Sequence, residues 1–175
     1  MEFCELALRR RSVRRFDGRK PDRETIQKVL DATFTAPSSK SVRSTRIAVT
    51  DDPKILETIA TMRSRGSSFV KYAPMVFFVM GDDSQTDLWR ENCAISATIL
   101  QFAAESLGLS SCWVHVNGRP HDDAEPEGKT AEEYLREQIP TLPRFRVMCV
   151  VAVGYPENQP VPHEPHDDSD KVFFL

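Results

Sequence analysis

The sequence predicts a single compact domain in which α-helices and β-strands both contribute to one core. Its 175 residues, 40% of them hydrophobic and 28% charged, are enough to bury a full apolar core without disulfides. Segments with helical spacing and segments with strand-like apolar runs follow one another, and no repeat or long linker divides the chain. The composition excludes collagen-like, coiled-coil and disordered proteins, and no apolar run approaches the roughly 20 residues of a membrane span.

Five segments carry helical signals. Asp22 and Asp52 are N-cap residues, and Pro53 occupies a first helical position. Thr130 and Glu133 are spaced as a capping box. The longest helix has apolar residues around much of its circumference, so we expect it to run through the core. The expected helices are residues 2–10, 22–36, the segment after Asp52, residues 86–107 and residues 130–139.

Four segments read as strands. Ile47 and Val49 alternate with polar neighbours, as in a strand with one buried face. Residues 75–80 and 145–153 are apolar throughout, which is typical of strands covered on both faces. A fourth strand is expected at residues 112–116.

The last twenty residues differ in character from the rest. Residues 156–170 hold four prolines and five acids, whereas Val172–Leu175 is strongly apolar. A polar tether that ends in an apolar strand predicts an arm that docks elsewhere, on a second subunit. A frayed tail is the alternative. We therefore divide the chain into one domain, residues 1–155, and a C-terminal arm, residues 156–175.

The four cysteines indicate a reducing compartment. Cys4, Cys93, Cys112 and Cys149 form no CxxC pair, and each stands where an apolar residue would fit, so we expect buried thiols. The first sixteen residues contain Glu2 and Glu5 and lack the apolar region of a secretory signal. These observations predict a soluble cytoplasmic protein with no membrane association.

Positive charge is concentrated near the N-terminus. The net charge of −3 argues against a general nucleic-acid binder, yet seven cations stand close together: Arg9, Arg10, Arg11, Arg14, Arg15, Arg19 and Lys20. In an extended conformation Arg10, Ser12 and Arg14 share one face, and two guanidinium groups with a hydroxyl make a good phosphate clamp. A solvated basic surface at the end of the first helix is the alternative.

A second candidate segment is Ala36-Pro37-Ser38-Ser39-Lys40. A rigid turn with small hydroxyl side chains can bring backbone N–H groups close to a planar polar ligand, although such a segment also serves as an ordinary helix stop. No Gly-x-Ser-x-Gly elbow supports a serine nucleophile. The Rossmann and P-loop glycine motifs are also missing, so neither explains a phosphate clamp.

Two other constellations predict little chemistry. Cys112 and His115 lie three residues apart on an expected strand, so their side chains leave opposite faces and cannot pair. His163 and His166 precede two aspartates in the proline-rich tail, but their spacing matches no closed zinc site. We predict no metal centre.

Six segments, taken in order, resemble the nitroreductase family of FMN-dependent oxidoreductases. They are Arg10–Phe16 (RRSVRRF), Ala36–Ser39 (APSS), Ala73-Pro74, Leu107–Leu109 (LGL), Ser111–Val114 (SCWV) and Gly154–Pro156 (GYP). The resemblance implies an α+β fold with a mostly antiparallel central sheet flanked by helices. It also implies an intertwined homodimer with two FMN sites at the interface, an arrangement that the arm fits.

The resemblance also implies roles for individual residues. Arg10 and Ser12 would hold the FMN phosphate and ribityl chain, with Arg11 contributing through its backbone. Arg14 would lie near the ribityl chain and the pyrimidine edge and favour the reduced flavin electrostatically. The remaining cofactor contacts would be Pro37, Ser38, Ser39 and Ser41 from the partner subunit, and Cys112, Trp113 and Val114 along the ring. FMN carries the redox chemistry, so no side chain is expected to be catalytic in its own right.

The chain departs from the common family pattern in three respects. After Pro37-Ser38-Ser39 it has Ser41, Arg43, Ser44 and Thr45 where many members have Asn, Gln, Pro and Trp. The tail offers His163 and His166 in place of a basic pair that grips the phosphate, and the chain is short. A second flavin-contacting cation is expected among Arg63, Arg65 and Lys71.

The resulting hypothesis is an FMN-dependent NAD(P)H oxidoreductase. By a ping-pong exchange it would pass electrons from NAD(P)H through FMN to nitroaromatic or quinone-like small molecules. Specialised flavin chemistry on the same fold, dehalogenation or flavin fragmentation, is the first alternative. The second is a protein without catalytic activity that binds a polyanion through its N-terminal arginines; the acidic balance elsewhere argues against this.

Overall fold

The computed structural model describes residues 2–175 and contains one four-stranded antiparallel sheet in the order β1-β2-β4-β3. The strands are β1 (Thr45–Thr50), β2 (Met75–Gly81), β3 (Ser110–His115) and β4 (Arg146–Gly154). The helices are α1 (Phe3–Arg9), α2 (Arg23–Thr33), α3 (Pro53–Thr61), α4 (Trp89–Ser106) and α5 (Ala131–Gln138). Short 3₁₀ turns are η1 (Ser39–Ser41), η2 (Ser68–Tyr72) and η3 (Ser169–Lys171). The expected mostly antiparallel, helix-flanked sheet is confirmed.

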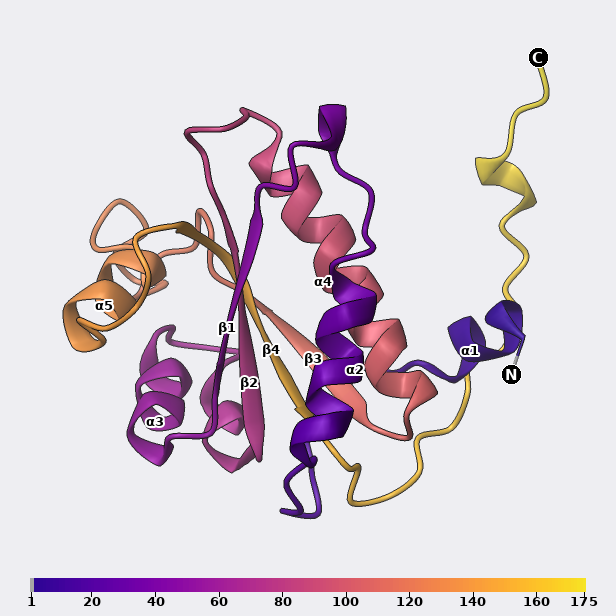
Figure 1. Cartoon of the computed structure of the whole chain (residues 1–175), viewed down its shortest axis with the longest axis horizontal. Helices are drawn as coiled ribbons and strands as arrows, with labels where there is room; N and C mark the ends of the chain where they lie inside the picture. Colours follow the sequence, from indigo (N-terminus) through magenta and orange to yellow (C-terminus); the bar gives the residue numbers. More distant parts are fainter. Residues whose placement is uncertain (1) are drawn as a thin grey trace.

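Helices cover both faces of the sheet, so the molecule has two apolar layers (Figure 1). Alternate residues of β2 divide between them: Phe77 packs toward α2 and α4, and Phe78 packs toward α3, η2 and α5. In β4 a register irregularity opposite Val79 and Met80 resets the alternation. Every residue of β2 is buried, as its unbroken apolar run predicts.

Helix caps occur where the sequence places them. Asp22 accepts a hydrogen bond from the Thr25 N–H, and Asp52 accepts one from the Lys54 N–H. Both halves of the Thr130–Glu133 capping box form. Because each cap satisfies backbone donors that the helix leaves free, the start of these helices is encoded locally.

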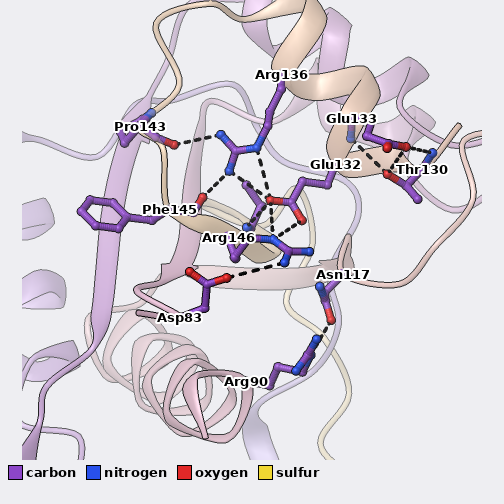
Figure 2. Close-up of polar contacts among 11 residues, drawn as sticks. Asp83, Arg90, Asn117, Thr130, Glu132, Glu133, Arg136, Pro143, Phe145 and Arg146 are labelled. Atoms are coloured by element: carbon purple, nitrogen blue, oxygen red, sulfur yellow. Dashed lines mark hydrogen bonds and ion pairs between the residues drawn. The ribbon is translucent and has the colours of Figure 1, made fainter. Parts of the chain in front are cut away.

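Helix α5 is attached to the sheet by a buried carboxylate (Figure 2). Glu132 is 7% exposed and accepts from Arg136 Nη2 at 3.0 Å, from Arg146 Nε at 3.2 Å and from the Val147 N–H at 3.0 Å. Arg136 also donates to the carbonyl oxygens of Pro143 and Phe145. One carboxylate therefore joins α5, β4 and the turn between them.

Several expected element boundaries shift. Helix α2 ends at Thr33 instead of residue 36, because the chain tightens into i→i−3 hydrogen bonds at Thr35 and Ala36, and Pro37 has no N–H to continue them. Helix α4 begins at Trp89 instead of residue 86, and β3 extends from Ser110 because β4 continues to Gly154 and pairs with it.

Two expectations about burial are wrong. Helix α4 does not run through the core of the chain: Cys93 and Leu100 are buried against the sheet, but Ile95 on the outer side is 39% exposed. Cys4 is exposed, because α1 has no buried residue, although Cys93, Cys112 and Cys149 are buried. Val172–Leu175 is exposed and forms no strand within residues 2–175, so its expected docking on a second subunit stays a prediction.

The C-terminal segment leaves the domain after β4 and extends past α1 (Figure 1). The His163 N–H donates to the Leu8 carbonyl at 2.8 Å. At the end of the segment Val172, Phe173 and Phe174 are 55%, 81% and 96% exposed. Within residues 2–175, none of the helices is long and apolar enough to cross a bilayer.

We predict that Glu132→Gln lowers the free energy of unfolding by about 2 kcal/mol, because it removes the charge that two guanidinium groups and a backbone N–H share. Chemical denaturation monitored by circular dichroism measures this. Glu137→Gln in the same helix is the matched control, since Glu137 forms a half-exposed pair with Lys129 that contributes at most about 1 kcal/mol. Equal losses in the two variants would contradict a structural role for the buried carboxylate.

Candidate functional site

The N-terminal cations stand on a segment whose backbone is tied to the ends of β3 and β4. Ser12 forms a parallel bridge with Ser111, and the Val13 N–H donates to the Ser111 carbonyl at 3.0 Å. Further along, Phe16 pairs antiparallel with Pro156. These pairings hold residues 12–17 extended, which is the conformation that the phosphate-clamp hypothesis requires.

A glycine allows this segment to approach the sheet. A Cβ added to Gly154 would lie 2.4 Å from Pro74 Cγ and 3.0 Å from Phe16 Cδ1, closer than real side chains come. Glycine is therefore needed at the end of β4 so that Pro74 and the Phe16 ring can pack over the backbone. Both Gly154 and Pro74 belong to segments that carried the family resemblance.

Arg10 and Arg14 bring positive charge to the start of β3. Burial raises the pKa of the Cys112 thiol, and the positive charges of Arg14 and Arg10 act in the opposite direction. Both guanidinium groups are thus within electrostatic reach of Cys112. Arg14 and Ser12 are exposed and Arg10 is half-buried. The structure brings these three residues and Cys112 together at one end of the sheet.

Two further residues lie beside the arginines: a tail histidine that the sequence offered in place of a basic pair, and Glu105, which was not foreseen from the sequence. The Arg11 guanidinium lies 3.1 Å from His163 Nδ1, so the C-terminal segment brings one of its histidines to the basic cluster. Glu105, at the end of α4, is 6% exposed and lies 3.8 Å from Arg9 Nε. Burial raises the pKa of Glu105, and Arg9 and Arg10 partly offset that effect. The one sequence signal for this ion pair was a glutamate on the side of α4 that faces the core.

The serine loop, residues 36–43, lies at the start of β1. The Ser39 N–H donates to Asn92 Oδ1 at 2.9 Å, and the Asn92 amide donates to Ser44 Oγ, so the first turn of α4 holds the loop. Ser38 Oγ accepts from the Arg43 N–H. The Ser39 N–H is therefore used inside the protein, and the exposed Pro37 and Ser41 remain open to a ligand.

This loop stores backbone strain. Lys40, Ser41 and Arg43 have φ values of 50°, 55° and 49°, in the left-handed region that non-glycine residues rarely adopt. Such residues persist where surrounding contacts over-determine the conformation, and they cluster at functional sites. A hollow of about 250 Å³ lies beneath the loop, lined among others by Phe34, Ser38 and Arg43.

One chain does not bring the loop and the N-terminal arginines together. The loop precedes Thr45, which pairs with Gly81 at one end of β2, whereas Ser111 pairs with Val153, the partner of Met75 at the other end. Seven residues of extended strand separate these ends by roughly 20 Å. The candidate residues therefore form two separate clusters in the chain.

Strand β3 carries the remaining candidates along an edge of the sheet. Cys112 pairs with Ala152 on the α3 and α5 face, and His115 pairs with Cys149 on the α2 and α4 face, so the two cannot meet, as expected. Trp113 Nε1 donates to His115 Nδ1 at 3.3 Å. Burial lowers the pKa of His115, with Arg119 and Arg63 adding to the effect.

The three candidates for a second cation lie in different places. Arg65 is 87% exposed and lies near Asp123, away from the arginine cluster. Arg63 Nη1 donates weakly to the His115 carbonyl, and its buried Nε has no partner within residues 2–175. Lys71 stands in η2 and lines the same hollow as Arg14.

Comparison with known proteins identifies the family. A sequence model described as the Nitroreductase family matches residues 7–63 and 61–155. The chain belongs to the nitroreductase family. Its C-terminal segment lies outside the matched residues, whereas the arginine segment, the serine loop and all four strands lie within them.

A solved structure and curated sequence relatives are similar to this chain over most of its length. An FMN-dependent nitroreductase from Clostridium difficile R20291 is 32% identical, with a TM-score of 0.89 over 98% of both chains. A putative NADH dehydrogenase/NAD(P)H nitroreductase of Methanothermobacter thermautotrophicus is 29% identical over 91% of this chain and 80% of its own length. A more distant relative, the iodotyrosine deiodinase of Thermotoga neapolitana, is 25% identical over 94% of this chain and 93% of its own.

Proposed function

We propose that this nitroreductase-family protein is an FMN-dependent NAD(P)H oxidoreductase that acts by a ping-pong exchange on nitroaromatic or quinone-like acceptors. The observation that carries the proposal is the extended segment that presents Arg10, Ser12 and Arg14 beside Cys112 at the start of β3. The names of the similar proteins, an FMN-dependent nitroreductase and an NAD(P)H nitroreductase, support it.

The residues at this end of the sheet fit FMN. Within residues 2–175 neither Arg10 nor Arg14 forms an ion pair with a carboxylate, so both retain donors for a phosphate or a flavin oxygen. Ser12 is exposed and adds a hydroxyl. Arg10 and Ser12 would hold the phosphate and ribityl chain, and Arg14 would place positive charge at the pyrimidine edge. Bound FMN would supply the redox chemistry, accepting a hydride from the nicotinamide and returning two electrons to the acceptor.

A second copy of the chain would complete the site. Pro37, Ser38, Ser39 and Ser41 lie at the far end of the sheet from the arginines, so they would contact the flavin of the partner subunit. Ile95 on the outer side of α4 (39% exposed) and Leu88 before its first residue (41% exposed) offer apolar surface for the contact between copies. The exposed Val172–Leu175 would dock on the partner as an arm.

The test of the proposed function is anaerobic flavin reduction. The purified protein should be yellow, with one FMN per chain and the mass of a dimer in sedimentation analysis. NADH or NADPH should bleach the flavin absorbance, and a quinone or nitroaromatic should restore it, with parallel lines in two-substrate kinetics. Failure of both nicotinamides to bleach the flavin would overturn the proposal.

Reductive dehalogenation is the second candidate, because of the similarity to the iodotyrosine deiodinase. Adding an iodotyrosine to the panel of acceptors distinguishes the two: release of iodide faster than quinone reduction would favour it. A colourless protein whose DNA binding falls steeply with salt would instead favour the polyanion-binding alternative.

The arginine segment gives a residue-level prediction. Arg10→Ala should weaken FMN binding tenfold to a hundredfold, since a charge-assisted phosphate contact contributes roughly 1.5–3 kcal/mol. Arg15→Ala, one step out of the alternation, should leave FMN affinity unchanged. Fluorescence titration of the apoprotein with FMN and with riboflavin measures both effects. Riboflavin lacks the phosphate, so Arg10→Ala should leave riboflavin affinity unchanged. Equal losses of FMN affinity in the two variants would mean a diffuse basic patch.

The C-terminal arm gives a prediction about the dimer. Deleting residues 171–175 should weaken the dimer, because buried apolar side chains contribute about 1.5–3 kcal/mol each. Sedimentation equilibrium measures the dimer dissociation constant. A full-length chain in which Val172, Phe173, Phe174 and Leu175 are all serine is the control for length, and it should weaken the dimer equally. An unchanged constant in both would identify the segment as a frayed tail.

A further inference from the structure

A basic groove with aromatic walls lies beside the candidate FMN site. Two hollows of about 310 and 470 Å³ adjoin one another, because Arg14, Arg15 and Tyr72 line both. The N-terminal segment forms one wall and η2 forms the other. Ser68, Phe69 and Lys71 complete the larger hollow, which no carboxylate lines.

The cations of this groove have few internal partners. Within residues 2–175 neither Arg14 nor Arg15 takes part in an ion pair. Lys71 Nζ lies 3.9 Å from Glu57, at the limit of an ion pair and in an exposed setting where such pairs contribute little. The other nearby acid, Glu157, lines only the smaller hollow. An anion therefore fits best in the larger hollow.

The aromatic residues present faces to the groove. Tyr72 is 69% exposed, so its ring is open to contact with a ligand. Lys71 Nζ lies 5.3 Å from the centre of the Tyr72 ring, and the Arg14 guanidinium lies 5.9 Å from the centre of the Phe69 ring. An exposed ring flanked by cations is suited to a planar base that carries a phosphate.

We propose that this groove binds the adenosine half of NADPH, with the 2′-phosphate in the larger hollow between Arg15 and Lys71 and the adenine against Tyr72. The proposal rests on the proposed function and extends it, because it names NADPH as the preferred hydride donor. A phosphate monoester carries close to two negative charges at pH 7, and the guanidinium fork of Arg15 can bind two of its oxygens. NADH lacks this group and would use only the aromatic contact.

The geometry gives Arg14 and Arg15 different ligands. Arg14 lies between the start of β3 and the groove, since it acts on Cys112 and also lines both hollows. Arg15 is exposed, and its carbonyl accepts from the Glu157 N–H, which fixes the backbone while the guanidinium stays free. The groove therefore connects directly to the residues assigned to FMN, as the binding site of a molecule that must reach the flavin should.

The first experiment measures binding without any redox step. Isothermal titration calorimetry of the purified flavoprotein with 2′,5′-ADP and with 5′-AMP compares ligands that differ only in the 2′-phosphate. The wild type should bind 2′,5′-ADP about tenfold more tightly, and high salt should remove most of the difference. Arg15→Ala and Lys71→Met should each lose the preference. Arg23→Ala, an exposed arginine at the start of α2, is the matched control and should keep it.

The second experiment separates this inference from the proposed function. In stopped-flow reduction, Arg15→Ala should raise the half-saturating concentration of NADPH about tenfold and leave that of NADH unchanged. Tyr72→Leu should raise both. Equal binding of 2′,5′-ADP and 5′-AMP, or a preference that survives Arg15→Ala and Lys71→Met, would overturn the groove assignment even if NADH reduces the flavin. Flavin that neither nicotinamide reduces would overturn the proposed function, whatever the fragments show.

Discussion

The backbone pairing of residues 12–17 with the ends of β3 and β4 is the constraint on which the candidate site depends. Four arginines stand within six residues of one another, and in a flexible segment their charges would point in many directions. The bridges at Ser12 and Phe16 hold the segment extended, so successive side chains alternate. Gly154 makes this docking possible, because any larger residue would collide with Pro74 and Phe16.

The rigid sheet behind this segment fixes the distance between the two clusters. Strands β2 and β4 are buried on both faces, and their pairing fixes which residues lie at each end. The arginine cluster lies at one end and the strained serine loop lies at the other. A buried sheet cannot bend to bring its ends together, so the proposal that one flavin contacts both clusters goes together with a second copy of the chain. Exposed apolar residues on α4 and in the C-terminal segment agree with that requirement.

Local chemistry made much of the fold predictable. The caps at Asp22, Asp52 and Thr130 satisfy free backbone donors within their own turn, so the sequence alone locates these helix starts. Both faces of β2 are apolar, so both are expected to be buried, and they are. The family resemblance added the antiparallel arrangement of the sheet. The expected burial of Cys4 and of the whole circumference of α4 was wrong, because burial depends on what packs against a surface.

The sequence by itself determined the segments, their caps and the residues able to bind a phosphate, because these depend on spacing and side-chain type. Only the tertiary structure decided which distant residues become neighbours. It placed His163 beside Arg11, Asn92 beneath the serine loop and Lys71 beside Arg14 and Arg15. Such pairings come from strand register and from the packing of turns. Both depend jointly on residues far apart in the chain. No local pattern encodes them, since each depends on contacts that exist only after the sheet has formed.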